Sequence, residues 1–260
     1  MTATPLNWYG GKMSAAAFIV SQIPAHRTYV EPFFGGGAVL FEKKRCAHEV
    51  LNDVNGAVVA FWRALRESPE ALERVCALTP FARDEWAAAD LAEDVDDLEL
   101  ARRLYLKTAT SYGHSMTAGF AYSTGQNGSK ARAMLNGLDR FSSAAHRLSG
   151  CLIENQDAVR IIERFGSARS CVIYADPPYV PSSRRSTSDY EHEMSEAHHR
   201  ELANALRDSP ATVLLSGYHS PLYDELYADW DSTEFGARHT DRAEVLWSNR
   251  PLPINEGVRP

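Results

Sequence analysis

The sequence predicts an α/β protein built on a largely parallel sheet, with its functional residues at the carboxyl ends of the strands. Three segments support this interpretation: an apolar run at 171–175, a strand, turn and helix pattern at 29–41, and a second apolar run at 49–53. Polar residues follow or end these runs, and open α/β sheets bind their ligands at that edge. The 260 residues suffice for one large domain, alone or with an inserted subdomain, and the 44% hydrophobic content can fill its core.

The other elements follow from hydrophobic spacing and end signals. Apolar residues predict helices at 14–21, 57–66 and 98–110. Ser68, Pro69 and Glu70 form a helix-start signal, and Ser195 caps a predicted helix at 196–207. Strands are predicted at 152–153, at 212–216, and at 244–247 as an edge or hairpin strand. Residues 111–128 are rich in Gly, Ser, Thr, Tyr and Asn and predict a loop or hairpin.

The run at 171–175 is short, β-branched and aromatic, as buried parallel strands are. It is followed by Asp176, Pro177, Pro178 and Tyr179. Proline fixes φ and has no N–H, so the carbonyl groups here remain available as acceptors. Acceptors beside an aromatic ring suit a planar group that carries an exocyclic NH2. Taken alone, the four residues are equally consistent with an ordinary turn at the end of a strand.

The second segment contains a turn with consecutive glycines between Glu31 and Gly37. Glycines allow positive φ and let the backbone approach a ligand closely. No Gly-Lys-Ser/Thr follows, which argues against a P-loop, and the carboxylate of Glu31 would repel a dinucleotide pyrophosphate. A carboxylate instead suits a positively charged ligand such as S-adenosylmethionine. Asp53, at the end of the next predicted strand, can accept hydrogen bonds from its ribose.

Five motifs in this order resemble the Dam-type adenine-N6 DNA methyltransferases. They are 7–12 (Asn-Trp-Tyr-Gly-Gly-Lys), 31–37 (Glu-Pro-Phe-Phe-Gly-Gly-Gly), 176–179 (Asp-Pro-Pro-Tyr), 190–194 (Tyr-Glu-His-Glu-Met) and 242–249 (Arg-Ala-Glu-Val-Leu-Trp-Ser-Asn). The resemblance spans nearly the whole chain, although residues 65–150 carry no matching motif. It implies a Rossmann-like class I methyltransferase fold with a mostly parallel seven-stranded sheet and an inserted, mainly helical DNA-recognition subdomain.

The resemblance also implies a division of the chain. Residues 1–64 and 151–250 would form the catalytic, cofactor-binding domain, residues 65–150 the inserted target-recognition subdomain, and residues 251–260 a loose Pro-rich tail. Because the insertion would choose the DNA sequence, the recognition site stays open.

The implied reaction is direct methyl transfer from S-adenosylmethionine to the N6 amino group of an adenine flipped out of double-stranded DNA. The implied catalytic residues are Asp176, Pro177, Pro178 and Tyr179. Acceptance of N6–H by the Asp176 carboxylate and the Pro177 carbonyl would localise the nitrogen lone pair, and Tyr179 would stack on the base. The implied cofactor-binding residues are Trp8, Lys12, Glu31, Phe33, Gly35, Gly37, Asp53, Asp157 and Asp176. Lys12 would contact either the cofactor or the target adenine.

The net charge of −7 is unusual for a protein that binds nucleic acid, so the distribution of charge matters more than its sum. Residues 84–99 contain acids and no Lys or Arg, whereas residues 100–150 are predominantly basic. This segregation predicts one face for phosphates, and ordinary solvated surface charge is the alternative. The DNA-binding candidates are Lys130, Arg132, Arg184 and Arg185.

Several alternatives remain at this point. Cytosine-N4 methylation uses the same amino chemistry but usually has Ser in place of Asp176; RNA could replace DNA; and a non-catalytic nucleic-acid-binding relative could keep the fold. The scattered cysteines (Cys46, Cys76, Cys151 and Cys171) predict reduced thiols and a cytoplasmic protein. No signal peptide, membrane span or metal-ligand spacing is recognised. A cognate restriction endonuclease is a possible partner, and the oligomeric state is open.

Overall fold

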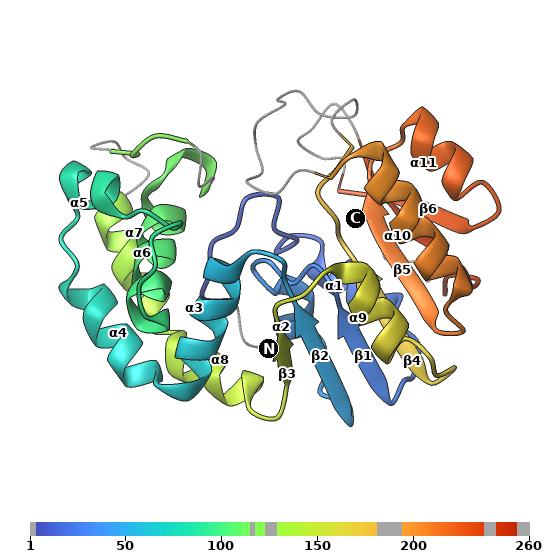
Figure 1. Ribbon diagram of the computed structural model, residues 1–260, viewed down its shortest axis with the longest axis horizontal. Helices are drawn as coiled ribbons and strands as arrows, with labels where there is room; N and C mark the ends of the chain where they lie inside the picture. Colours follow the sequence, from blue (N-terminus) through green and yellow to red (C-terminus); the bar gives the residue numbers. More distant parts are fainter. Residues whose placement is uncertain (1–3, 115–117, 123–128, 181–193, 237–242, 254–260) are drawn as a thin grey trace.

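A seven-stranded sheet forms the centre of the molecule (Figure 1). The computed structural model describes residues 4–114, 118–122, 129–180, 194–236 and 243–253. In spatial order the strands are β3 (Leu152–Glu154), β2 (His48–Asn52), β1 (Thr28–Glu31), β4 (Cys171–Ala175), β5 (Thr212–Gly217), β7 (Glu244–Ser248) and β6 (Asp231–Phe235). Neighbouring strands from β3 to β5 are parallel, whereas β7 is antiparallel to both β5 and β6. The predicted mostly parallel, seven-stranded sheet is therefore confirmed.

Successive side chains along each strand point to opposite faces of the sheet, so the core has two parts, one on each face. Tyr29 and Tyr174 belong to one apolar cluster, whereas their chain neighbours Val30 and Ile173 belong to the other. The first cluster lies under the helices α1 (Ala16–Ser21), α2 (Ala38–Glu42) and α3 (Gly56–Glu67). The second lies under α9 (Ala158–Phe165), α10 (Glu196–Asp208) and α11 (Pro221–Leu226). Both faces are thus covered, which explains the unbroken apolar sequence of β4.

A group of helices lies beside the β3 edge of the sheet (Figure 1). It consists of α4 (Pro69–Leu78), α5 (Arg83–Ala88), α6 (Asp97–Thr110), the short 3-10 helix η1 (Tyr112–His114), α7 (Lys130–Leu138) and α8 (Phe141–Leu148). Aromatic rings join this group to α3: Phe61 contacts the edge of Phe141 at a centroid distance of 5.9 Å, and Tyr105 contacts Phe141 at 5.2 Å. The helical group is therefore packed onto the sheet through α3 and α8.

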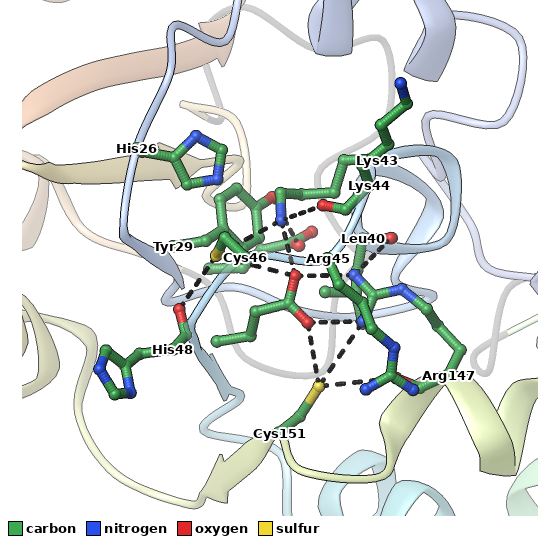
Figure 2. A network of polar contacts seen from close by, with 12 residues as sticks. His26, Tyr29, Leu40, Lys43, Lys44, Arg45, Cys46, His48, Arg147 and Cys151 are labelled. Carbon is green, nitrogen blue, oxygen red and sulfur yellow. Dashed lines mark hydrogen bonds and ion pairs between the residues drawn. The ribbon is translucent and has the colours of Figure 1, made fainter.

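A buried ion pair provides a second connection between these helices and the sheet. The Glu49 carboxylate on β2 accepts hydrogen bonds from Arg147 of α8 at 2.5 and 2.8 Å and from Lys43 at 2.6 Å. Figure 2 shows Arg147, Lys43 and Cys151 around this carboxylate. Burial raises the pKa of Glu49, but the hydrogen bonds from Arg147 and Lys43 outweigh it and lower the pKa to about 2. Glu49 therefore remains ionised inside the protein.

Most predicted elements lie where the spacing placed them, with small shifts at their ends. The Ser195 hydroxyl caps α10 by accepting from the His198 N–H, whereas the Ser68 side chain makes no capping hydrogen bond to α4. The predicted strand at 244–247 is the hairpin strand β7, and the edge belongs to β6 instead. Strand β6 (Asp-Ser-Thr-Glu-Phe) was not predicted, because its mostly polar sequence lacks the pattern of a half-buried strand.

Only residues 251–253 of the predicted loose tail (251–260) are described, and they are attached to the core. The Leu252 side chain is buried in the core, and its N–H donates to the Asp231 carboxylate at 2.8 Å. Residues 254–260 lie outside the described part of the chain. Among the described residues, no helix combines the length and the apolar character needed to cross a membrane.

Candidate active site

The carboxyl ends of β1, β2 and β4 open into one cavity of about 660 Å³. The predicted residues that line it are Trp8, Lys12, Glu31, Phe33, Gly35, Gly37, Asp53, Asp157, Asp176, Pro177 and Pro178. They come from segments far apart in the sequence, and the parallel register of the strands brings them together. The structure thus gathers the glycine turn and the Asp-Pro-Pro segment around a single space.

The glycine turn is shaped by the chain's own aromatic side chains. Gly35 and Gly37 have φ values of 43° and 68°, in the left-handed region that favours glycine. A Cβ atom on Gly35 would lie 2.7 Å from the Trp8 ring nitrogen, and one on Gly37 would lie 2.6 Å from the Phe34 ring. The glycines therefore allow Trp8 and Phe34 to pack against the turn, and the close approach of a ligand stays a prediction.

Asp53 joins the glycine turn to the start of α3. Its carboxylate accepts the Gly35 N–H at 2.8 Å and the Asn55 N–H at 3.0 Å. A carboxylate offers about four acceptor positions, so it can accept ligand hydroxyl groups in addition to these backbone donors. Asp53 is half-buried at the cavity wall. Its position is consistent with the predicted contact to a ribose.

Glu31 is buried at the end of β1 and accepts the Tyr29 hydroxyl at 2.8 Å. Burial raises the pKa of Glu31 to about 8, although the hydrogen bond from Tyr29 lowers it, because a charged carboxylate is poorly solvated there. Nearby Asp176 raises this pKa further. A cationic group placed in the cavity beside Glu31 would favour the ionised carboxylate, which suits the predicted amine-bearing ligand.

Asp176 belongs to a compact cluster of charged and hydroxyl groups. The Lys12 ammonium lies 2.9 Å from one Asp176 oxygen, and the Tyr179 hydroxyl lies 3.2 Å from the other. The same ammonium lies 3.4 Å from Glu244, and the same hydroxyl donates to Glu244 at 3.0 Å. Burial raises the pKa of Asp176; the Lys12 ammonium lowers it, and the Glu244 carboxylate raises it again. The cluster therefore holds two carboxylates around one ammonium.

Glu244 was not predicted as a site residue. Its only signal in the sequence is its place in the motif at 242–249, of which the described part begins at residue 243. The antiparallel insertion of β7 next to β5 brings Glu244 beside Asp176, and sequence spacing does not predict that pairing.

Tyr179 lies in the cluster, but its ring does not line the cavity. The side chain is buried, with the Tyr218 ring at its edge (4.8 Å between centroids) and the Lys12 ammonium 5.0 Å from its ring centre. Stacking on a flipped base would require part of this ring to become accessible. The stacking role remains a prediction.

The other predicted residues take simpler positions. Asp157 caps α9 by accepting the N–H groups of Val159 and Arg160, and it also lines the cavity. Phe33 packs partly against the second apolar cluster. No cluster of three or more His, Cys, Asp or Glu side chains suited to a metal ion occurs within the described ranges.

Two arginines of the basic segment lie against the acidic segment in space. Arg102 pairs with Glu85 and Glu99, and Arg103 pairs with Glu93 and Glu99. These arginines pair with part of the acidic segment, and one helical turn places both beside Glu99.

Two other basic residues between 100 and 150 also contact groups within the protein. Arg147 is buried against Glu49, and Lys107 lies 3.8 Å from the Trp86 ring centre. Lys130 and Arg132 remain as candidates on α7, half-buried and exposed respectively. Arg184 and Arg185 lie outside the described residues.

Most of the chain is similar to known proteins. Residues 8–242 match the family described as D12 class N6 adenine-specific DNA methyltransferase. The chain is similar to the type II methyltransferase M1.LlaDCHI of Lactococcus lactis subsp. cremoris, with 24% identity over 91% of this chain and 88% of that protein. It is also similar to the DNA N-6-adenine-methyltransferase of Escherichia phage P1, with 25% identity over 85% of this chain but 30% of that protein.

A third relative is the DNA adenine methylase of Vibrio cholerae serotype O1, 28% identical over 68% of this chain and 65% of that protein. Among solved structures, the rRNA methyltransferase aviRa of Streptomyces viridochromogenes aligns with a TM-score of 0.39 and 12% identity, over 91% of this chain and 82% of that one. Because this structural similarity is weak, the strand order of the sheet itself defines the fold.

Proposed function

This chain belongs to the D12 class N6 adenine-specific DNA methyltransferase family, and from that premise we propose how its residues divide the work of methylating adenine N6 in DNA. The observation that carries the proposal is the shared cavity, in which the glycine turn, Asp53 and Asp176 meet. One side of this cavity suits S-adenosylmethionine and the other suits the target base.

The residues present fit the cofactor. Asp53, held by two backbone N–H groups at the glycine turn, would accept the ribose hydroxyls. Glu31 would face the amine, because a buried carboxylate whose pKa is about 8 gains from a cationic partner. Asp157 would contact the adenine ring of the cofactor, and Trp8 and Phe33 would supply apolar surface. When bound, S-adenosylmethionine supplies an electrophilic methyl group.

The chain's contribution to the chemistry is to hold and polarise the target amino group. The N6 lone pair is delocalised into the adenine ring, so the free amine is a weak nucleophile. Acceptance of its hydrogens by the Asp176 carboxylate and the Pro177 carbonyl localises the lone pair and fixes its direction. The rigid segment from Asp176 to Pro178 keeps these acceptors in place. The proton that N6 releases passes to Asp176.

Lys12 acts on the target side of the cavity. Its ammonium contacts Asp176 at 2.9 Å and the Gly10 carbonyl at 3.0 Å, so it holds the carboxylate that receives the adenine. Tyr179 extends the same cluster, and its ring stacks on the flipped base when the duplex is bound. Stacking worth roughly 1–3 kcal/mol offsets part of the unstacking energy.

Residues 65–150 form the target-recognition subdomain, and residues 1–64 with 151–250 form the catalytic domain. The separate helical group beside the β3 edge supports this division. Lys130 and Arg132 on α7 contact the phosphates of double-stranded DNA.

Partners and location follow from the reaction. Free cysteines and a DNA substrate support a cytoplasmic location. The type II designation of the Lactococcus relative is the only support for a cognate restriction endonuclease as a second partner. An Asp at position 176, where cytosine-N4 enzymes usually carry Ser, favours adenine as the target.

The test is methyl transfer from radiolabelled S-adenosylmethionine to unmethylated genomic duplex DNA, followed by nucleoside analysis. We expect the label in N6-methyladenine, and sequencing of the methylated sites then yields the recognition sequence. Label in N4-methylcytosine, or transfer to RNA alone, would overturn the proposal.

A further inference from the structure

We infer that Glu244 is a positioning residue that shares the donors of Lys12 and Tyr179 with Asp176, and so leaves Asp176 able to accept the adenine amino group. The inference rests on the proposed function and adds a residue to it. Glu244 is the first residue of β7, and 25% of its side chain is exposed. Its carboxylate lies within hydrogen-bonding distance of Tyr179 and ion-pairing distance of Lys12.

The argument begins with the number of donors. The Tyr179 hydroxyl has one proton but lies near two carboxylates, 3.0 Å from Glu244 and 3.2 Å from Asp176. The two carboxylates therefore share one donor, and Asp176 receives less of that proton than it would without Glu244. The Lys12 ammonium is likewise divided, at 2.9 Å from Asp176 and 3.4 Å from Glu244.

The net charge of the cluster also indicates that Glu244 keeps Asp176 available as an acceptor. One ammonium paired with one carboxylate forms a neutral pair, and such a carboxylate is a weak acceptor for another N–H. A second carboxylate gives the cluster a net negative charge, part of which remains on Asp176. The Lys12 side chain is 5% exposed, so water competes only weakly with Asp176 for its ammonium. Glu244 therefore maintains the acceptor strength of Asp176 without touching the substrate.

The ionisable groups around Asp176 make the effect measurable through pH. Among the described residues they are Lys12, Glu31, Tyr174, Tyr179, Tyr223 and Glu244. The Glu244 carboxylate raises the pKa of Asp176. Removal of the charge on Glu244 therefore lowers the pKa of Asp176. The acid limb of the rate profile would then move to lower pH, which a loss of packing alone would not cause.

The decisive variant is Glu244→Gln, which keeps the shape and removes the charge. We expect roughly a tenfold lower single-turnover rate at saturating cofactor, the size typical of coupling within a charged network. The acid limb of the rate profile should shift to lower pH, and the affinities for cofactor and DNA should not change. Glu244→Asp should keep most of the rate. Glu234→Gln, on the exposed face of the paired strand β6, is the matched control and should behave as wild type.

A double variant separates positioning from folding. In a Lys12→Met background only the Tyr179 hydroxyl is still shared, so Glu244→Gln should lower the rate by clearly less than its roughly tenfold effect on the wild-type protein. An equal loss in both backgrounds, or a Glu244→Gln rate equal to wild type, would overturn the inference. Wild-type protein that makes no N6-methyladenine would refute the proposed function itself, so the two failures are distinguishable.

Discussion

The Lys12 ammonium and the Asp176 carboxylate form a buried ion pair at 2.9 Å, joining the N-terminal Gly-Gly-Lys loop to the end of the central strand β4. The side chain of Lys12 is 5% exposed and that of Asp176 is 19% exposed. The lysine is therefore held against the carboxylate that follows β4. This pair links the motif at 7–12 to the Asp-Pro-Pro segment and sets the first prediction.

Asp176→Asn should abolish most methyl transfer while the protein still binds S-adenosylmethionine. The amide keeps the shape of the side chain but loses the negative charge that polarises the adenine amino group. We expect the single-turnover rate to fall by about 100-fold or more, as when a preorganised electrostatic group is removed. Rapid-quench assays with labelled cofactor measure the rate, and calorimetry measures cofactor binding. A rate within a few-fold of wild type would contradict the role of Asp176 as acceptor.

Glu31 should make cofactor binding and stability depend on pH. Its pKa is about 8 in the folded protein, above the ordinary value of 4.5, so the folded state binds the extra proton between these values. Stability therefore falls as pH rises from about 4.5 through 8, because over this range the unfolded chain releases a proton that the folded protein retains on Glu31. At pH 8.5, Glu31→Gln should raise Tm by about 2–4 °C, measured by calorimetry.

The affinity for S-adenosylmethionine should increase with pH, whereas the stability of the protein decreases. The amine of S-adenosylmethionine prefers the ionised carboxylate, so binding by the wild type should strengthen as pH rises toward 8. Glu31→Gln should bind more weakly and without this dependence. An unchanged pH profile in the variant would show that Glu31 does not face the amine.

Reversal of charge on α7 should weaken DNA binding and leave the cofactor site intact. The double variant Lys130→Glu with Arg132→Glu should reduce the slope of log affinity against log salt by about 2, one for each lost phosphate contact. Fluorescence anisotropy with a labelled duplex at several salt concentrations measures this slope. The control reverses two exposed arginines outside α7, Arg164 and Arg169. Equal slopes in both double variants would mean that α7 does not contact the DNA.

Local signals were sufficient to predict which segments would line the cavity. Each lies at the end of a short apolar strand and is marked by residues with strong backbone preferences, such as Gly35, Gly37 and Pro177. Because parallel strands end at one edge, these segments had to converge once the strands were identified. The seven-stranded sheet followed from the family resemblance, since the polar sequence of β6 does not itself predict a strand.

Contacts between distant segments were not predictable in this way. Glu244 reaches Lys12 only because β7 inserts antiparallel beside β5, and Arg102 reaches Glu85 only because α5 and α6 pack together. A count of charges along the sequence does not predict which charges meet in space. For the same reason the sequence did not predict the contact between Glu49 and Arg147, which are far apart in the chain but joined by two hydrogen bonds.

Removal of the Arg147 guanidinium should destabilise the protein strongly. Arg147→Met leaves Glu49 buried with Lys43 as its remaining charged partner, and breaking a buried pair from one side typically costs about 3–5 kcal/mol. Urea unfolding at pH 7 measures the free energy of unfolding. The control is Arg164→Met, because this arginine is 66% exposed and lies 4.0 Å from Glu154, so its loss should cost less than about 1 kcal/mol.

The pH dependence shows why wild type and Arg147→Met should differ in their free energy of unfolding. The pKa of Glu49 is lowered to about 2, so the stability that its ionised form contributes is complete above about pH 4.5 and is lost as pH falls toward 2. The gap between wild type and Arg147→Met should therefore narrow over that range. A gap that stays constant down to pH 2 would mean that Arg147 stabilises the protein by packing alone. The helices beside the sheet would then depend on the Phe61, Tyr105 and Phe141 contacts for their attachment.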